Sequence, residues 1–435
     1  MSSADRQGWL AHWQAAGRLP SVVGGVAEGG VLTWVGSAGD VPGDPADLQY
    51  RIGSITKTFV AVAVLRLRDE GLLDLDAPLR RYVPEAAYGG ATLRGLLAHS
   101  AGLPSEPAGP WWERSPGVEV PALLAANPAE RAVAGPDTFF HYSNLGFALL
   151  GEVVARVRGT HWWEGVRAEL TAPLGMDRTT YHPQAPHTQG RSVDHFASTL
   201  TEEPLQDTGA MAPAGQLWST LPDLARWAWL LAGGRPDLLA PESREELVTV
   251  RPPAEGYGLG VRVLEVGGRR MAGHTGSMPG FLASCFTEDA DERRTSRATL
   301  ALANGTVGLV SDAVPAQLLG VVGPPPRTLR PWVPTEVVPT EIRPLLGLWF
   351  WGNTALEARW SSGYLELRNL AGPERVDHFA LDGTDLVGIA GYHRGERLEV
   401  VPGPDGTAAH LACATFLYTR TPYDPASPVP GGAPG

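Results

Sequence analysis

The sequence has almost no lysine. Of its 35 Lys and Arg residues, only Lys57 is a lysine and the other 34 are arginines. Arginine keeps its proton at any pH that a protein meets, whereas burial can convert a lysine into a neutral amine that accepts and returns a proton. A function that needs a proton-transferring amine therefore has a single candidate in this chain.

Cysteines, long apolar runs and excess positive charge are also scarce. The two cysteines, Cys285 and Cys413, lie 128 positions apart and are expected to be independent buried thiols rather than a disulfide. No apolar run is long enough to span a bilayer, and the first residues lack the basic head and apolar segment of a secretory signal. A formal charge of -12 argues against nucleic acid and anionic membranes as partners. Together these absences predict a cytoplasmic protein.

The length and composition predict a soluble protein with more than one domain. At 435 residues, with 43% apolar and 19% charged residues, the chain is long enough for two or three domains. The clearest linker is the proline-rich stretch 323–343. It separates a predicted catalytic domain, 1–322, from a smaller domain, 344–421. A tail rich in Pro and Gly, 422–435, is expected to be flexible.

Hydrophobic patterning predicts that the catalytic domain mixes helices and strands. Helices are expected at 8–16, from Ser54 to about 70, and at 92–98, 143–158, 161–170, 219–231 and 309–319. Strands are expected at 22–27, 31–35 and 48–52, followed by an antiparallel series at 259–266, 269–272, 281–287 and 299–303. Beyond the linker, short β segments between 346 and 418 alternate with Gly-containing turns, such as 404–406, and predict a small closed sheet or barrel.

The lysine belongs to a pattern that is typical of nucleophilic catalysis. Lys57 lies three residues after Ser54 at the start of an apolar helical run, which places hydroxyl and amine on one helix face, one turn apart. A serine beside such an amine has a built-in base. The plain alternative is a stray lysine on a solvated helix face, and the two later motifs decide against it.

Two other patterns compete for a chemical role. Residues 98–102, Ala-His-Ser-Ala-Gly, are a degraded form of the Gly-x-Ser-x-Gly elbow of α/β-hydrolases, but that elbow needs a preceding strand and a first glycine. This segment instead follows a predicted helix. Asp74 and Asp76 could suggest a metal site, but no third ligand is near in the sequence, and helix capping is the better interpretation. No metal or other cofactor is expected.

The first later motif is Tyr142-Ser-Asn144, at the start of a predicted helix. A phenol at a helix N-terminus and near a lysine has its oxyanion form favoured, so Tyr142 could accept the proton of Ser54. Asn144 could bond both Lys57 and a substrate amide.

The second later motif is His274-Thr-Gly-Ser277, beside the predicted strand 281–287. Gly276 would let a substrate backbone approach the sheet edge. The backbone N–H of Ser277, paired with that of Ser54, would form an oxyanion hole.

Ser-x-x-Lys, Tyr-x-Asn and His-Thr-Gly, in this order, resemble the motifs of the serine β-lactamase and penicillin-binding-protein superfamily, specifically its class C and D-alanyl-D-alanine carboxypeptidase branch. Further matching stretches lie at 96–104, 144–151, 173–176 and 213–220, so the resemblance covers about residues 20 to 320. It implies an α/β (α+β) fold in which a helical lobe and an antiparallel sheet sandwich enclose the site.

The resemblance also implies roles for the motif residues. Ser54 would be the acylated nucleophile, served by Lys57 and Tyr142 for proton transfer, Asn144 for substrate orientation, and Thr275 and Gly276 for substrate binding. His274 stands where β-lactamases of this branch have a lysine, whose fixed charge helps to hold a β-lactam carboxylate. A mostly neutral histidine would hold it less well, so β-lactamase activity is not expected.

Within the superfamily, the chain most resembles the penicillin-binding-protein-type thioesterases, which release nonribosomal peptides from carrier proteins as head-to-tail macrolactams. The likeness includes the catalytic set, a small lipocalin-like C-terminal domain and the loop Trp111-Trp112-Glu-Arg. It implies a peptidyl carrier protein as partner and a D-residue at the acyl position. Paired tryptophans usually indicate core packing, but on this loop they could instead form the wall of a substrate cleft.

Arg420, at the end of the last apolar strand, is the candidate for a barrel arginine that holds substrate carbonyls or repels a protonated amine; a solvated arginine is the alternative. Two functions of other kinds remain open. A stand-alone hydrolase of D-peptides or esters would share every catalytic residue. A non-catalytic sensor of β-lactams or peptides would keep the fold but would not need Lys57.

Overall fold

The computed structural model describes residues 1–289, 296–327, 330–403 and 407–422. It divides into two compact units: unit 1 is Met1–Ser192 with Glu202–Trp332, and unit 2 is Val193–Thr201 with Val333–Gly435. The predicted turn at 404–406 and the predicted tail beyond Pro422 lie outside the described residues.

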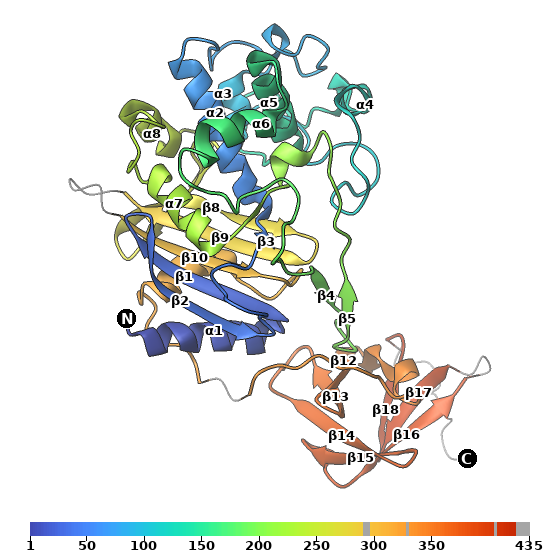
Figure 1. Ribbon diagram of the computed structural model, residues 1–435. Helices are drawn as coiled ribbons and strands as arrows, with labels where there is room; N and C mark the ends of the chain where they lie inside the picture. Colours follow the sequence, from blue (N-terminus) through green and yellow to red (C-terminus); the bar gives the residue numbers. More distant parts are fainter. Residues whose placement is uncertain (290–295, 328–329, 404–406, 423–435) are drawn as a thin grey trace. The chain divides into compact units, whose positions relative to one another are not determined.

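Unit 1 is built on a six-stranded antiparallel sheet with the order β2-β1-β10-β9-β8-β7 (Figure 1). Its strands are β1 Ser21–Glu28, β2 Val31–Gly39, β7 Arg262–Val266, β8 Arg269–Met278, β9 Phe281–Glu288 and β10 Arg297–Ala303. Two-residue turns that contain glycine with positive φ close the β1–β2, β7–β8 and β8–β9 hairpins, and such turns fix strand register. The antiparallel series predicted from the sequence is confirmed.

Helices cover both faces of this sheet. On one face, α1 (Ser3–Gly17) and α9 (Val314–Leu318) pack through a cluster that includes Trp9, Trp13 and Leu318. The other face carries a helical layer made of α2 Thr56–Asp69, α3 Leu93–Leu97, α4 Val120–Ala126, α5 Asn144–Arg158, α6 Trp162–Val166, α7 Leu221–Leu231 and α8 Pro241–Val248. In α2, every residue from 56 to 65 is buried. A helix that is apolar on all sides belongs in the interior, and α2 therefore holds the candidate site at the centre of unit 1.

Several predicted boundaries differ from the structure. Helix 219–231 begins only at Leu221, because Trp218–Ser219 forms strand β6, which pairs with β3 (Tyr50–Arg51), all that remains of predicted strand 48–52. The predicted helix 161–170 is α6 followed by a π turn, Arg167–Thr171. The predicted helix at 309–319 is reduced to α9 after a 3₁₀ turn, Ser311–Ala313. Helix α1 is longer than predicted, because Ser2 and Asp5 form a capping box at its start.

Unit 2 contains a closed barrel of eight antiparallel strands. They are β11 Gly347–Trp351, β12 Thr354–Ser361, β13 Tyr364–Asn369, β14 Val376–Asp382, β15 Asp385–Ala390, β16 Arg397–Pro402, β17 Ala408–Cys413 and β18 Phe416–Thr419. Alternate residues of the strands point inward, such as Leu365 and Leu367 of β13, and join Trp349 and Phe379 in one core. The small closed barrel expected beyond the linker is confirmed.

The proline-rich stretch 323–343 is shared between the two units. Trp332 exchanges two backbone hydrogen bonds with the Gln14 side chain of unit 1, at 2.8 and 3.0 Å. Val338 is buried in the barrel core of unit 2. The division therefore falls at residue 332, within the stretch predicted as one linker.

A second crossing between the units was not predicted. Strands β4 (Arg191–Val193) and β5 (Leu200–Glu202) pair, and the residues between them belong to unit 2. There the carbonyl oxygen of Phe196 accepts a hydrogen bond from the Trp360 N–H at 2.7 Å. No sequence pattern marks this excursion, because a segment of nine residues inside a long loop has no period of its own.

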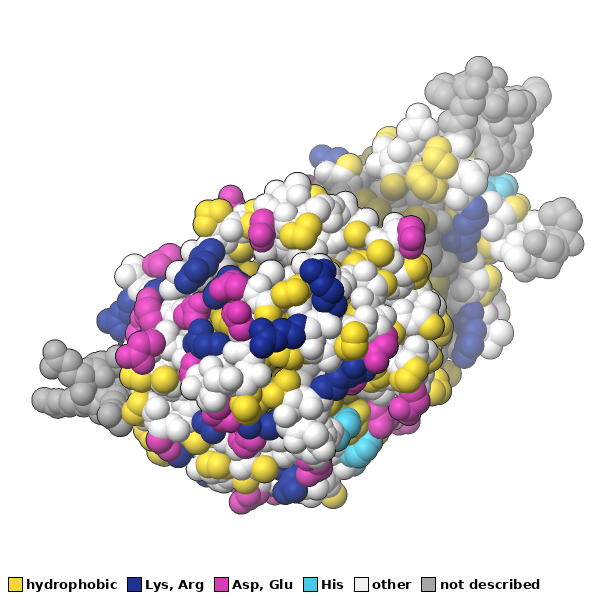
Figure 2. Space-filling view, turned by 90° about the horizontal axis from the view of Figure 1, so that it is seen from above, with side chains coloured by type: hydrophobic (Ala, Val, Ile, Leu, Met, Phe, Trp, Pro, Cys, Tyr) yellow, Lys and Arg dark blue, Asp and Glu magenta, His cyan; other side chains and the backbone are white. Residues whose placement is uncertain are grey.

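Figure 2 looks onto the helical side of unit 1, where basic and acidic side chains alternate. The only lysine, Lys57, is fully buried, so the basic side chains on this face are arginines. Arg94 pairs with Asp76 at 2.7 Å, and Arg158 pairs with Glu70 at 2.6 Å. Exposed pairs of this kind contribute little stability, about 0–1 kcal/mol each. In the part of the chain that the structure describes, no helix is long and apolar enough to cross a membrane.

Candidate active site

The candidate nucleophile and its base meet where a short turn joins the central helix. Ser54 is in the 3₁₀ turn η1, Gly53–Ile55, and Lys57 is in the first turn of α2. Lys57 Nζ is hydrogen-bonded to Ser54 Oγ at 2.9 Å and to the carbonyl oxygen of Ala214 at 2.6 Å. The predicted one-turn spacing therefore brings amine and hydroxyl into direct contact.

Burial sets the protonation state of Lys57. Desolvation lowers the pKa of this amine to about 7, against the opposing effect of the Glu106 and Glu113 carboxylates. The N-terminus of α2 acts in the same direction as burial, because the positive end of a helix disfavours a cation. An amine that is close to half-protonated at neutral pH suits a group that must take a proton from Ser54 and then return it.

The rate of acylation is expected to rise with pH through about 7. Below this pH Lys57 is an ammonium ion with no lone pair, and above it the neutral amine is the main form. With an uncharged ester or thioester substrate, kcat/KM should increase about tenfold per pH unit on the acidic side and then level off. Steady-state kinetics across neutral pH measure this profile. A profile that rises only near the ordinary lysine pKa would show that the buried Lys57 amine is not the base.

Tyr142 lies beside Ser54, but not as the expected phenolate. It directly precedes Ser143, the N-cap of α5, it lines the same cavity as Ser54, and Lys57 Nζ lies 5.0 Å from the centre of its ring. Desolvation raises the pKa of the phenol above its ordinary value, and this effect exceeds the lowering by Ser54. The phenolate prediction is wrong, because the cost of burying an anion exceeds the attraction of the helix N-terminus. A neutral Tyr142 can relay a proton between Ser54 and a leaving group.

Asn144 is held by a glutamate that the sequence analysis missed. Its amide nitrogen donates to Glu106 at 2.7 Å, and Trp112 Nε1 donates to the same carboxylate at 2.7 Å. Among the described residues no hydrogen bond joins Asn144 to Lys57, so that predicted contact is wrong. Trp112 is buried in the core, whereas Trp111 is 55% exposed. Trp112 thus packs and positions Glu106; a cleft wall made by the two indoles stays a prediction.

A cavity of about 320 Å³ lies beside the nucleophile. It is lined by Ser54, Phe140, Tyr142, Glu255, Gly256, Tyr257, Arg262, His274, Thr275 and Ser277. This volume is at the small end of the range for ligand sites. A larger hollow of about 790 Å³, bordered by His161, Tyr181 and Asp207, contains neither the serine nor the lysine.

Ser277, one half of the predicted oxyanion hole, lies against the turn that carries Ser54. Gly53 has φ +52°, and a Cβ at this position would lie 2.6 Å from the backbone nitrogen of Ser277. Met278 and Phe281 close the two-residue β8–β9 turn, and Ser277 pairs with Leu282 one position further from it. In such a hairpin this second pair is not hydrogen-bonded, so the Ser277 N–H points away from β9. The N–H of Ser277 therefore faces the turn that carries Ser54, as an oxyanion hole needs.

Close packing explains why residue 276 is a glycine. A Cβ on this residue would lie 2.0 Å from the carbonyl oxygen of Ile52, so only glycine lets β8 approach the segment before Ser54. The same closeness seats Ser277 against Gly53. Contact between Gly276 and a substrate backbone stays a prediction.

His274 is at the end of a buried hydrogen-bond chain. The Ser143 N–H donates to His99 Nδ1 at 3.0 Å, so a neutral His99 keeps its proton on Nε2, which contacts the Tyr257 hydroxyl at 3.2 Å. That hydroxyl then donates to His274 Nε2 at 3.1 Å, and His274 Nδ1 donates to the Thr275 carbonyl oxygen at 2.5 Å. Burial lowers the pKa of His274 to about 3, and the nearby Lys57 adds to this effect. The imidazole is neutral, with its tautomer fixed by the chain.

Removal of the Tyr257 hydroxyl is expected to impair the site without unfolding it. Tyr257→Phe leaves two buried nitrogens unpaired, each costing about 1–3 kcal/mol, so kcat/KM should fall by about 10- to 100-fold. Without the hydroxyl donor, the pKa of His274 should rise from about 3 towards its ordinary value, which NMR titration measures. Tyr88→Phe, which removes a hydroxyl bonded to Pro128 outside the site, is the control. Unchanged activity and an unchanged His274 titration would contradict this role.

Arg262 is a second site residue that the sequence analysis missed. Its Nη1 donates to Thr275 Oγ1 at 3.2 Å and to Asp312 at 2.6 Å, and its side chain lines the cavity. The signal for it was present: the Gly267-Gly268 turn sets a register in which Arg262 pairs with Gly273, directly before His274. A guanidinium therefore supplies the positive charge that a neutral His274 lacks.

Arg420 is engaged within unit 2. Its guanidinium donates to the carbonyl oxygens of Leu346 and Leu348, both at 3.1 Å, and to that of Pro344, and it stacks on Trp349. These contacts give Arg420 a structural role, because they join the end of the last barrel strand to the start of the first. Its role as a substrate-binding residue stays a prediction.

The competing serine at position 100 does not lie on a strand-to-helix elbow. Ser100 Oγ donates to Asp137 at 2.6 Å, and the segment follows helix α3 rather than a strand. Its neighbour His99 instead belongs to the chain that holds His274. Asp74 accepts the Asp76 N–H at 2.9 Å within a turn, and Asp76 pairs with Arg94 at 2.7 Å. The predicted helix capping by these carboxylates is wrong, because the next helical turn begins after Pro78 without a side-chain cap.

Comparison with known proteins agrees with this site. The family described as Beta-lactamase matches residues 7–320, and a domain of unknown function, DUF7586, matches residues 338–420. A serine activated by a lysine within a helical layer and an antiparallel sheet defines a penicillin-binding-protein-like serine hydrolase. The chain belongs to the β-lactamase family.

Curated relatives match part of the chain. Putative beta-lactamase-like 1 of Homo sapiens is 32% identical over 244 residues, 50% of this chain and 47% of the relative. The D-alanyl-D-alanine-carboxypeptidase/endopeptidase AmpH of Escherichia coli K12 is 30% identical over 197 residues, 42% of this chain and 48% of the relative. The chain thus spans about half the length of the curated relatives it matches.

Solved structures share the fold of one or both units. A D-stereospecific amidohydrolase from Streptomyces superposes with TM-score 0.60 at 26% identity over 74% of this chain and 98% of its own. The octameric penicillin-binding protein homologue from Pyrococcus abyssi gives 0.66 at 20% identity, covering 96% and 100%. SurE with D-Leu gives 0.56 at 24% identity, covering 97% and 100%.

Proposed function

We propose that the protein is a trans-acting serine acyltransferase. It takes a peptidyl group, with a D-residue at the acyl position, from a thioester on a peptidyl carrier protein, and releases it as a head-to-tail macrolactam. The observation that carries the acyl transfer is the 2.9 Å hydrogen bond between Ser54 and Lys57, whose burial keeps the amine near half-protonated at neutral pH. The carrier-bound substrate implies an enzyme that works in the cytoplasm.

Acylation uses the groups around Ser54. Neutral Lys57 takes the Oγ proton as Oγ attacks the thioester carbonyl carbon, and the carbonyl oxygen becomes an oxyanion between the N–H groups of Ser54 and Ser277. When the oxyanion collapses, the carbon–sulfur bond breaks. The departing thiolate receives the proton from Lys57, directly or through the Tyr142 hydroxyl. Lys57 is then a neutral base again and Ser54 carries the peptide as an ester.

Release requires an amine to reach the ester before water does. The α-amine of the bound peptide is in the same molecule as the ester, and well-oriented intramolecular groups reach effective concentrations of about 10⁵ M or more. The neutral amine attacks the ester carbon, its proton passes to Lys57, and Ser54 leaves as the hydroxyl after taking that proton. The products are a cyclic amide and the free enzyme.

Two likenesses support the choice of a peptide cyclase. The sequence resembles the penicillin-binding-protein-type thioesterases in its catalytic set and its C-terminal barrel, and the structure of SurE, solved with D-Leu, has a similar fold over both units. The D-stereospecific amidohydrolase also supports a D-residue at the acyl position.

A synthetic peptidyl thioester tests the proposal. The purified chain is incubated with an N-acetylcysteamine thioester of a peptide with a free N-terminus and a C-terminal D-residue, beside the L-epimer and Ser54→Ala. Formation of the macrolactam from the D-epimer alone, with an acyl-Ser54 adduct in the intact mass, is the expected result. Linear acid as the sole product would favour a hydrolase, and absence of any adduct would favour a sensor.

Hydrolysis of D-peptides with a free carboxylate is the second candidate, because Arg262 lies beside Thr275 in the cavity. A thioester leaves a neutral thiol with no carboxylate to bind, so the cyclase predicts that Arg262→Gln changes thioester acylation by less than about threefold. A D,D-carboxypeptidase predicts instead a large rise in KM for peptides that end in a free D-residue. Measuring both substrates on this variant distinguishes the two functions.

A further inference from the structure

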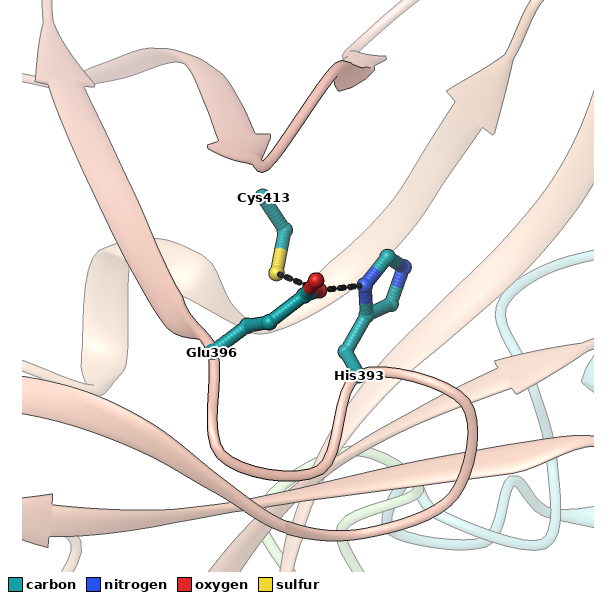
Figure 3. Close-up of side chains that lie close together, drawn as sticks. All are labelled: His393, Glu396 and Cys413. Carbon is teal, nitrogen blue, oxygen red and sulfur yellow. Dashed lines mark hydrogen bonds and ion pairs between the residues drawn. The ribbon is translucent and has the colours of Figure 1, made fainter.

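Unit 2 brings a histidine, a glutamate and a cysteine together at one end of the barrel. His393 and Glu396 lie on the turn between β15 and β16, and Cys413 ends β17 (Figure 3). The Glu396 carboxylate lies between the other two, 2.5 Å from His393 Nδ1 and 3.7 Å from Cys413 Sγ. One ligand atom from each residue lies within 4.8 Å of the other two. None of these groups takes part in the chemistry proposed for Ser54.

The register of the barrel accounts for this meeting. Leu398, two residues after Glu396, pairs with Cys413 across β16 and β17. Asp377 of β14 fixes the start of the turn, because its Oδ1 accepts the backbone N–H of His393 at 3.0 Å. His393 and Cys413 are buried, whereas the Glu396 side chain is 44% exposed, so the cluster opens to solvent on the glutamate side.

We propose that His393 Nδ1, the Glu396 carboxylate and the Cys413 thiolate bind one divalent transition-metal ion, with zinc the best match. Imidazole, carboxylate and thiolate are all zinc ligands, and a thiolate disfavours magnesium and calcium. A divalent ion would balance the negative charges of the Glu396 carboxylate and of the thiolate that forms when the ion binds. The exposed side of Glu396 supplies the entry path and room for a water ligand.

The hydrogen bond on the far side of the imidazole fits a metal ligand. His393 Nε2 is 3.1 Å from the Tyr418 hydroxyl. Without metal, Nδ1 carries the proton and donates to Glu396, and Nε2 accepts from Tyr418. With metal on Nδ1, the proton lies on Nε2 and donates to the hydroxyl oxygen, which orients the ring as outer partners of zinc-bound histidines do.

Binding has a defined proton balance. The imidazole proton moves from Nδ1 to Nε2 through solvent, and the Cys413 thiol, which donates to Glu396 before metal arrives, loses its proton to buffer. One proton should therefore be released for each metal ion bound near neutral pH.

The test uses the full chain without a histidine tag, kept reduced, and Co²⁺ and Zn²⁺ as probes. One equivalent of Co²⁺ is expected to bind at micromolar concentration with a sulfur-to-cobalt charge-transfer band in the near ultraviolet. Calorimetric titration of Zn²⁺ in buffers of different ionisation enthalpy should give about one proton released. The band and the binding should be lost in Cys413→Ser. They should persist in Cys285→Ser, the matched control, because Cys285 is buried in unit 1 and belongs to no such cluster among the residues that the structure describes.

A second variant covers the case in which Cys413→Ser does not fold. Glu396→Gln keeps an amide oxygen that can accept from His393 and Cys413 but removes the carboxylate ligand, and it should weaken Zn²⁺ binding at least tenfold with an unchanged circular dichroism spectrum. Failure of the folded wild-type chain to bind either ion at micromolar concentration would overturn the proposal. Binding of Zn²⁺ by Cys413→Ser or by Glu396→Gln that is as tight as binding by the wild type would also overturn it.

Discussion

Replacing Lys57 by arginine is expected to lower kcat/KM for acylation by about 10³-fold or more. A guanidinium cannot lose a proton at neutral pH, so the variant retains a positive charge beside Ser54 but has no base. General-base catalysis is worth about 10² to 10⁴ in rate, and the longer, forked side chain also displaces the carbonyl contact that Lys57 makes with Ala214. The measurement is the amplitude and rate of acyl-Ser54 formation by intact mass, together with steady-state kinetics.

Two further variants separate proton transfer from charge and from helix stability. Lys57→Met removes both charge and base, and it should lose as much activity as Lys57→Arg if the proton transfer is what matters. Arg66→Lys makes the opposite exchange elsewhere on α2, where the arginine side chain contacts the Leu238 carbonyl oxygen at 2.7 Å. It is the control for exchanging these two residue types on this helix, and it should keep wild-type kinetics. Retention of more than a tenth of wild-type kcat/KM by folded Lys57→Arg would show that another group takes the Ser54 proton.

The parts of the fold that could be predicted from the sequence are those with a strong local period. Strand 281–287 and its neighbours were recognisable because apolar residues dominate them and glycine turns separate them. The catalytic helix was recognisable because the apolar run after Ser54 is continuous. The excursion of residues 193–201 into unit 2 could not be predicted, because its partners Thr335 and Trp360 are remote in sequence and its few residues show no pattern.

The candidate site divides in the same way. Ser54 and Lys57 are one turn apart on a helix, so local geometry alone brings them together. The chain from His99 through Tyr257 to His274 joins three segments, and only the tertiary structure shows that they meet.

The phenolate expected at position 142 failed for a different reason. Local features, the helix N-terminus and the neighbouring lysine, were known from the sequence, but the extent of desolvation was not. Burial of an ionisable group is a property of the whole fold, and it acted in opposite directions on the two partners of Ser54. It lowers the pKa of Lys57 towards neutrality and raises that of Tyr142, so that the amine rather than the phenol becomes the base.

Replacing Gly53 by alanine is expected to lower kcat by about 10² to 10³-fold in a protein that still folds. The added Cβ would lie 2.6 Å from the Ser277 nitrogen and 2.9 Å from its carbonyl oxygen, and both are backbone atoms of strand β8, which its pairing with β9 holds in place. The turn that carries Ser54 must therefore retreat from β8. The N–H groups of Ser54 and Ser277 would then no longer reach one oxyanion, and loss of one such donor costs about 10² to 10³ in kcat.

Gly71→Ala is the matched control for Gly53→Ala, because it isolates backbone strain from the clash. Gly71 follows the same helix at its other end with φ +73°, and a Cβ there would meet nothing within 4 Å. Both variants force alanine into a left-handed conformation, at a cost of about 1–2 kcal/mol in folding stability. Thermal unfolding should therefore show a loss in both, while only Gly53→Ala loses kcat. Because the oxyanion forms after substrate binds, the loss should appear in kcat rather than in KM. A change confined to KM would mean that the contact between η1 and β8 serves stability alone. An equal loss of kcat in Gly71→Ala would mean the same.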